Sequence, residues 1–161
     1  KPPPKFISDL GDSIIWLRPN FYAVNFSVCR KKIEGRGGYM IPMGVDHPVV
    51  VESIQSFFTR SPLPEADTYI IPTGSGVALS GILRCLPRKK VVAICTRPIK
   101  SVQKVVNRYV QAPSVWFVEG HDGTESVPFP AHRFWEKQAW NWLIANHKQI
   151  PGTICFVNLG S

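Results

Sequence analysis

The residues best suited to chemistry lie in a glycine-rich stretch at positions 73–78, Thr-Gly-Ser-Gly-Val-Ala. An apolar run precedes this stretch and a run with helical spacing follows it, which is the pattern of a strand, a glycine turn and a helix. Amide groups at such a turn bind anions, most often phosphate, because glycine lets the backbone approach the ligand. The hydroxyls of Thr73 and Ser75 add two donors. The stretch predicts a phosphate site, and a strand-to-helix turn that binds nothing is the alternative.

A second group of polar residues, Asp46 and His47, lies in a loop that follows Gly44 and leads into a predicted helix at 49–60. His47 beside an aspartate could act as a functional pair. Residues of these types before a proline more often serve in turns and helix caps, and Pro48 suits the first position of a helix. We therefore favour the capping role, with the side chains of Val50, Ile54, Phe57 and Phe58 facing inward.

Other familiar motifs do not fit. Gly74, Gly76 and Gly81 match neither the dinucleotide-binding fingerprint nor the P-loop, and no lysine follows Gly81. Ser75 is not the nucleophile of a hydrolase elbow, because Thr73 and Val77 stand where that motif has its two glycines. The four histidines and four cysteines lack metal-ligand spacing, so we expect neither a metal site nor disulfides. Arg97 ends the next predicted strand, where the 2′-phosphate of NADP would lie, and an NADP-binding oxidoreductase remains a weaker alternative.

Composition points to an ordinary globular domain with a real core, since 44% of the 161 residues are hydrophobic. The longest apolar runs are far below the ~20 residues that span a bilayer, and no signal-peptide pattern is found. We therefore expect a cytoplasmic protein without membrane contact. The net charge of +8 favours an anionic partner. Nucleic acid is one such partner, but the basic runs are short and do not alternate with aromatic residues.

Strands and helices alternate along the sequence and must position these candidate site residues. This alternation predicts an α/β fold with a largely parallel sheet. Ligands of such sheets bind at the carboxyl ends of the strands. We expect residues 43–44, 73–76, 96–97 and 158–161 to meet along that edge. The predicted strands are at 13–17, within 37–44, at 69–71, 91–95, 114–118 and 153–157, and the predicted helices at 21–33, 49–60, 77–86, 101–110 and 135–146.

Five segments in order resemble the C-terminal half of a fold-type II pyridoxal-phosphate (PLP) enzyme, closest to the aminocyclopropane-carboxylate deaminase and D-cysteine desulfhydrase branch. They are LGDSIIWLRP, GGYMIPMGVDHP, DTYIIPTGSGVALSGIL, FWEKQAWNWL and GTICFVNLGS. The resemblance implies part of a tryptophan synthase β-like fold, with three layers and a mostly parallel sheet flanked by helices. Residues 1–44 would be the tail of a first, small domain, and residues 45–161 the domain that binds the cofactor phosphate.

The resemblance also implies roles for individual residues. Glu136 matches the carboxylate that faces the pyridine nitrogen, and Trp135 matches an active-site tyrosine but lacks its hydroxyl. The substrate-side loop would hold Gly44, Asp46 and His47. The cofactor-binding residues would be Thr73, Gly74, Ser75, Gly76, Val77 and Ala78 around the phosphate, with Asn158, Gly160 and Ser161 closing the side of the ring nitrogen.

The family's Schiff-base lysine lies in its N-terminal half, and none of the lysines in this sequence occupies a matching motif. The resemblance therefore implies one part of a PLP-dependent lyase or deaminase that acts on an amino acid or a similar small molecule. An N-terminal half or a partner chain would complete it, in a homo-oligomer or a complemented assembly, and the isolated chain would be inactive. The alternative is a non-catalytic remnant that binds a phosphorylated ligand, nucleic acid or a partner protein.

Overall fold

The computed structural model describes residues 22–38, 40, 44–111, 113–122, 126–132 and 135–159. It divides into two compact units, residues 1–42 and residues 43–161. In the first unit, helix α2 (Tyr22–Glu34) agrees with the helix predicted there, and Arg30 and Glu34 form an ion pair across one turn at 2.8 Å. The predicted strand at 13–17 lies outside the described residues, as do residues 39 and 41–43 of the strand predicted within 37–44.

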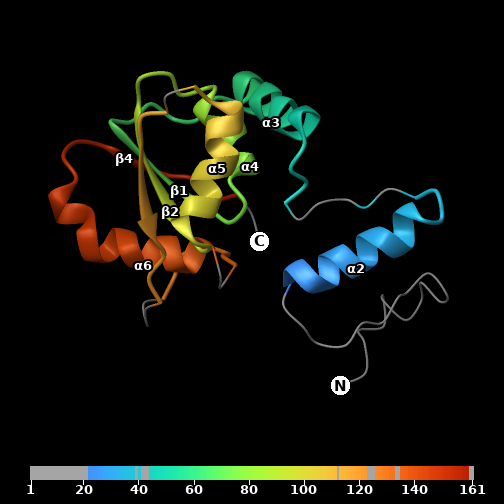
Figure 1. The fold of residues 1–161 in the computed structure, drawn as a ribbon. Helices are drawn as coiled ribbons and strands as arrows, with labels where there is room; N and C mark the ends of the chain where they lie inside the picture. Colours follow the sequence, from blue (N-terminus) through green and yellow to red (C-terminus); the bar gives the residue numbers. More distant parts are fainter. Residues whose placement is uncertain are drawn as a thin grey trace. The chain divides into compact units, whose positions relative to one another are not determined.

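The second unit is built on a sheet of four parallel strands in the order β3-β2-β1-β4 (Figure 1). In register, Ile70 of the central strand pairs with Val92 on one side and Phe156 on the other. The expected α/β fold with a largely parallel sheet is confirmed. The strands are β1 (Thr68–Thr73), β2 (Lys90–Cys95), β3 (Val115–Glu119) and β4 (Ile154–Phe156).

Helices cover both faces of this sheet and complete three layers (Figure 1). Successive residues of a strand point to opposite faces, so Ile71 and Ala93 pack under α4 and α5 whereas Ile70 and Val92 pack under α6. No helix in the described ranges is long and apolar enough to cross a bilayer. The helices of this unit are α3 (Pro48–Arg60), α4 (Val77–Leu83), α5 (Ile99–Tyr109) and α6 (Glu136–Asn146), followed by a 3₁₀ turn at His147–Gln149.

Two local predictions are wrong. The strand predicted at 69–71 does not end before Pro72 but continues as β1 to Thr73, whose carbonyl accepts a hydrogen bond from the Thr96 amide at 3.0 Å. Proline removes only a donor, so the acceptors around it still join the ladder. Phe57 does not face inward and is 55% exposed. The buried face of α3 contains Val51, and Phe57 lies six residues further on, away from that face in a helix of 3.6 residues per turn.

Asp67 and Thr153 join the starts of β1 and β4. The Asp67 carboxylate accepts hydrogen bonds from the Thr153 amide at 2.7 Å and from its hydroxyl at 2.9 Å. In return, the Thr153 carbonyl accepts the Asp67 amide at 3.1 Å. A Cβ at Gly152 would overlap the Asp67 carboxylate, so only glycine lets the chain turn here, at a φ of 82°. This junction fixes β4 beside β1.

We expect Asp67→Asn to destabilise the fold at neutral pH. The hydrogen bond from the Thr153 amide is the main cause that lowers the pKa of Asp67 below its usual value of 3.8. The stabilisation is therefore complete above that usual value and is lost as the pH falls through the lowered pKa of the folded state. Urea denaturation at several pH values should show the difference between wild type and variant shrinking in acid, and a difference that is constant with pH would contradict this role.

Candidate functional site

The order of the strands creates a topological switch point between β1 and β4. The chain leaves β1 through α4 toward β2, whereas it reaches β4 through α6 on the opposite face of the sheet. The segments that follow β1 and β4 therefore diverge at the carboxyl ends of the strands. In open α/β sheets this divergence leaves a crevice in which ligands bind.

A cavity of about 530 Å³ lies at this switch point. Its volume is in the range of small-molecule sites, roughly 300–1,000 Å³. The predicted meeting of loops along one edge is confirmed for Gly44, for residues 73–76 and for Arg97, and the last segment contributes Leu159. The lining residues are Gly44, Pro72, Thr73, Gly74, Ser75, Gly76, Ala78, Arg97, Trp135, Glu136 and Leu159.

The glycine loop turns its backbone toward this cavity. Gly76 has a φ of 91°, a left-handed conformation that favours glycine, and a Cβ there would lie 3.1 Å from the Val102 carbonyl oxygen. The Ser75 hydroxyl accepts a long hydrogen bond from the Val77 amide at 3.4 Å. The amides of Gly74, Ser75 and Gly76 donate to no acceptor on another described residue. Three consecutive donors are therefore available to an anionic ligand.

Glu136 and Trp135 contribute another wall. Glu136 is only 2% exposed, and its carboxylate accepts the His132 amide at 3.1 Å. The Trp135 ring stacks on the His132 ring with 4.1 Å between centroids. The indole nitrogen lies 3.1 Å from where a Cβ on Gly74 would be, so this wall and the glycine loop are in close contact. An indole N–H can donate a hydrogen bond but cannot relay a proton as a hydroxyl can.

The loop from Gly44 to His47 lies against the glycine loop. Gly44 has a φ of 73°, and a Cβ there would overlap the Ser75 side chain. Asp46 anchors this loop to the end of α5, because its carboxylate accepts Arg108 Nη1 at 2.8 Å and the Tyr109 hydroxyl at 2.7 Å. The favoured capping role of His47 is confirmed, since its Nδ1 accepts the Val49 amide at 3.3 Å.

Two predicted cofactor residues do not line the cavity. Val77 is 2% exposed and its side chain packs in the core. Asn158 donates a hydrogen bond to the Pro130 carbonyl at 3.2 Å. Gly160 and Ser161 lie outside the described residues. The sequence reasoning missed His132, which supports both Trp135 and Glu136, and no motif marks it.

Among the described residues, neither a reactive lysine or cysteine nor a metal site is found at this cavity. No lysine is among the described residues that line the cavity. Cys95, at the end of β2, is 3% exposed, and burial together with Glu119 raises the pKa of its thiol to about 11. Thiolate is the reactive form, so Cys95 is inert at neutral pH. Among the described residues, no three histidine, cysteine or acidic side chains gather where they could hold a metal ion.

Comparison with known proteins assigns this chain to no family. No protein-family model matches the chain, and no curated protein sequence matches it. The resemblance to PLP enzymes stays a prediction, and the function has to be argued from the cavity itself.

We expect Tyr109→Phe to lower the free energy of unfolding by about 1 kcal/mol, because it removes the hydrogen bond to the Asp46 carboxylate. The same change should weaken the binding of inorganic phosphate. Asp46 fixes the loop in which Gly44 packs against Ser75, and Ser75 belongs to the expected phosphate site. Urea denaturation and phosphate titration measure the two effects. In an Asp46→Ala background the tyrosine substitution should add almost nothing, and an equal cost in both backgrounds would show that the two residues act independently.

Proposed function

We propose that this chain is the cofactor-phosphate-binding part of a PLP-dependent lyase or deaminase that acts on an amino acid or a similar small molecule. One observation carries the proposal: the unbonded amides of the glycine loop and the buried Glu136 carboxylate line the same cavity at the switch point. A ligand that satisfies both needs a phosphate at one end and a cationic or protonated nitrogen at the other. PLP has both groups.

The fit to the phosphate rests on donors and charge. The amides of Gly74, Ser75 and Gly76 supply neutral donors, a side chain at Gly44 would overlap Ser75, and one at Gly74 would press on the Trp135 ring. Arg97 lines the same cavity and adds a positive charge, which strengthens hydrogen bonding to an anion. This set of residues suits a phosphate better than a carboxylate, because three consecutive amides and a cation can satisfy several oxygens.

The fit to the ring rests on Glu136. Glu136 is only 2% exposed and its carboxylate is oriented by the His132 amide, so it offers a fixed acceptor at the wall of the cavity. An acceptor of this kind holds a proton on a pyridine nitrogen. The cofactor supplies the electron sink for the chemistry on the amino acid. Trp135 can pack against a ring and donate one hydrogen bond, but it cannot move a proton.

The lining residues that the structure describes fit non-covalent binding, and no anchoring lysine is among them. We therefore propose that a complementing polypeptide, or another subunit of an oligomer, supplies the Schiff-base lysine and the groups that bind the substrate carboxylate. The proposal keeps the cytoplasmic location expected from the sequence. By itself, this chain is expected to bind the phosphorylated ring without turning over an amino acid.

Pyridoxine 5′-phosphate is the sharpest probe, because it has an alcohol in place of the aldehyde and cannot react with surface lysines. We expect calorimetry to show that it binds at a one-to-one ratio and that inorganic phosphate competes with it. Unphosphorylated pyridoxine should bind at least about tenfold more weakly, which is about 1.4 kcal/mol. Equal affinity for the two compounds would contradict a phosphate site in this cavity.

Glu136→Gln should weaken pyridoxine 5′-phosphate about tenfold or more, because a hydrogen bond to a charged group contributes ~1.5–3 kcal/mol. Its affinity for inorganic phosphate should stay unchanged, since the substitution is at the other end of the ligand. Glu52→Gln, on the exposed surface of α3, is the matched control. Loss of both affinities in Glu136→Gln would indicate a damaged loop rather than a ring contact.

A dinucleotide site is the second candidate, and the position of Arg97 after β2 favours it. In that case NADPH would bind more tightly than NADH, and Arg97→Gln would remove most of the difference. Titration by NADPH fluorescence tests this directly. If pyridoxine 5′-phosphate binds and neither dinucleotide displaces it, the dinucleotide function is excluded.

A further inference from the structure

The indole of Trp135 lies where a side chain on Gly74 would be. Its Nε1 is 3.1 Å from the position of a Cβ on Gly74, and both residues line the cavity at the switch point. The indole N–H is therefore held beside the first of the three unbonded amides of the glycine loop. Trp135 is 44% exposed, so a ligand in the cavity can reach it.

This indole N–H has no acceptor among the residues that the structure describes. The Thr96 hydroxyl is the neighbouring polar group, with its Oγ1 at 3.8 Å from the Gly74 Cβ position. That hydroxyl donates to the Thr73 carbonyl at 3.4 Å. An indole nitrogen is a donor only, so it is satisfied either by water or by an acceptor on a ligand in the cavity.

The imidazole of His132 holds the indole in this place. The two rings stack with 4.1 Å between centroids and 28° between planes. Such a stack covers one face of the indole and restricts the direction in which its N–H points. A restricted donor binds an anion more tightly than a freely rotating one, because less side-chain freedom is lost on binding.

The backbone of His132 is fixed by contacts that do not involve its ring. Its amide donates to the Glu136 carboxylate at 3.1 Å, and its carbonyl accepts the Trp135 amide at 3.2 Å. Three residues earlier, the Phe129 ring packs edge-on against Trp140 with 5.2 Å between centroids. A substitution at position 132 therefore changes the stack and leaves the backbone hydrogen bonds in place.

We propose that Trp135 donates its indole N–H to the anion bound by the glycine loop, and that His132 is the positioning residue that holds this donor in place. The inference rests on the proposed function, because it takes the phosphate of that ligand as the acceptor. It adds a fourth neutral donor, from a side chain, to the amides of Gly74, Ser75 and Gly76. Donors on two sides of a cavity favour a tetrahedral anion, whose oxygens point in several directions, over a planar carboxylate.

Trp135→Phe keeps an aromatic ring and removes the donor. We expect it to weaken the binding of inorganic phosphate and of pyridoxine 5′-phosphate by the same factor, about three- to tenfold, because both ligands lose one hydrogen bond to a charged group. Calorimetry measures both affinities. If inorganic phosphate binds wild type and variant equally, the indole does not donate to the anion and the proposal is overturned.

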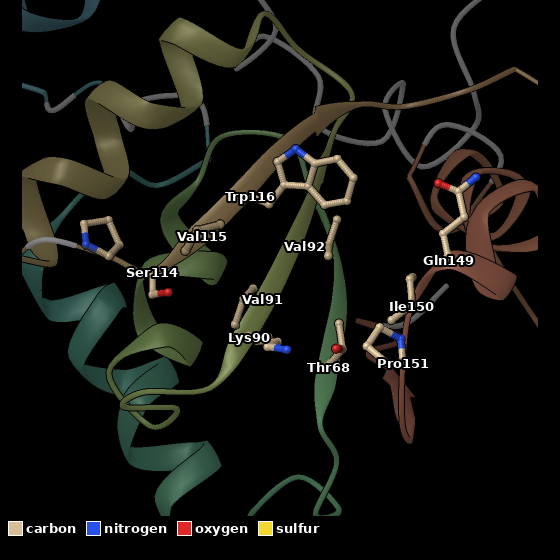
Figure 2. A pocket seen from close by; sticks show the side chains of 11 residues that line it. Thr68, Lys90, Val91, Val92, Ser114, Val115, Trp116, Gln149, Ile150 and Pro151 are labelled. Atoms are coloured by element: carbon tan, nitrogen blue, oxygen red, sulfur yellow. The ribbon is translucent and has the colours of Figure 1, made fainter.

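Trp116→Phe is the matched control, since it removes the indole of another exposed tryptophan. Trp116 borders a second cavity of about 570 Å³, near the amino ends of the strands, which shares no described lining residue with the site (Figure 2). Phosphate should bind this variant like wild type. Circular dichroism on each variant checks that it is folded.

His132→Ala should weaken phosphate about threefold, and His132→Phe, which can still stack on the indole, should bind within about twofold of wild type. In a Trp135→Phe background, His132→Ala should add no further loss, because the imidazole acts through the indole. Equal losses from His132→Ala in both backgrounds would overturn the positioning role.

The indole resonance of Trp135 is a readout that a merely structural role would not move. In a ¹⁵N-labelled sample, the cross-peak missing from Trp135→Phe identifies it among the five tryptophans. It should move downfield as phosphate is added to wild type, and move less in His132→Ala. A resonance that stays in place while phosphate saturates the site would overturn the proposal, even where pyridoxine 5′-phosphate binds as expected. Conversely, if the resonance moves but pyridoxine 5′-phosphate binds no more tightly than phosphate itself, the donor role is supported and the PLP function fails.

Discussion

The site depends on one constraint, the position of β1 between β2 and β4 in a parallel sheet. Because the chain leaves β1 toward one face and reaches β4 from the other, the loops at the carboxyl ends must separate and leave a cavity. The hydrogen bonds between Asp67 and Thr153 hold this pairing at the opposite end of the strands. The same sheet that builds the core therefore also creates the cavity.

Close packing of glycines then shapes this cavity. Gly44 lies against Ser75, Gly74 lies against the Trp135 indole, and Gly76 lies against α5. A side chain would overlap Ser75 at Gly44 and would be crowded at Gly74 and Gly76, so glycine at these positions lets the backbone of the loop form the wall. The Asp46 carboxylate, bound to Arg108 and Tyr109, holds the first of these contacts in place. Residues that are far apart in the sequence therefore meet at this cavity because their backbones pack closely together. No single sequence motif contains them.

The sequence predicted the fold class, the parallel sheet and the meeting of three loops at one edge, because hydrophobic periodicity and glycines mark strands and turns. It did not predict that β1 continues through Pro72 or that Phe57 faces outward, since both depend on the neighbouring strand and helix. The support of Glu136 by His132 was also missed, because a backbone amide from a loop carries no sequence signal. Trp116 is 60% exposed on β3, an edge strand, and only the strand order reveals which strands lie at the edges.

In the proposed complex, the amides of the glycine loop bind the phosphate of the cofactor, and the cofactor ring lies toward Glu136. Amide chemical shifts in a ¹⁵N-labelled sample, followed as pyridoxine 5′-phosphate is added, test it most directly. We expect large shifts for the amides of Gly74, Ser75 and Gly76, smaller shifts around Glu136, and none for Trp116. Unchanged shifts at the three loop amides, with saturable shifts elsewhere, would contradict it.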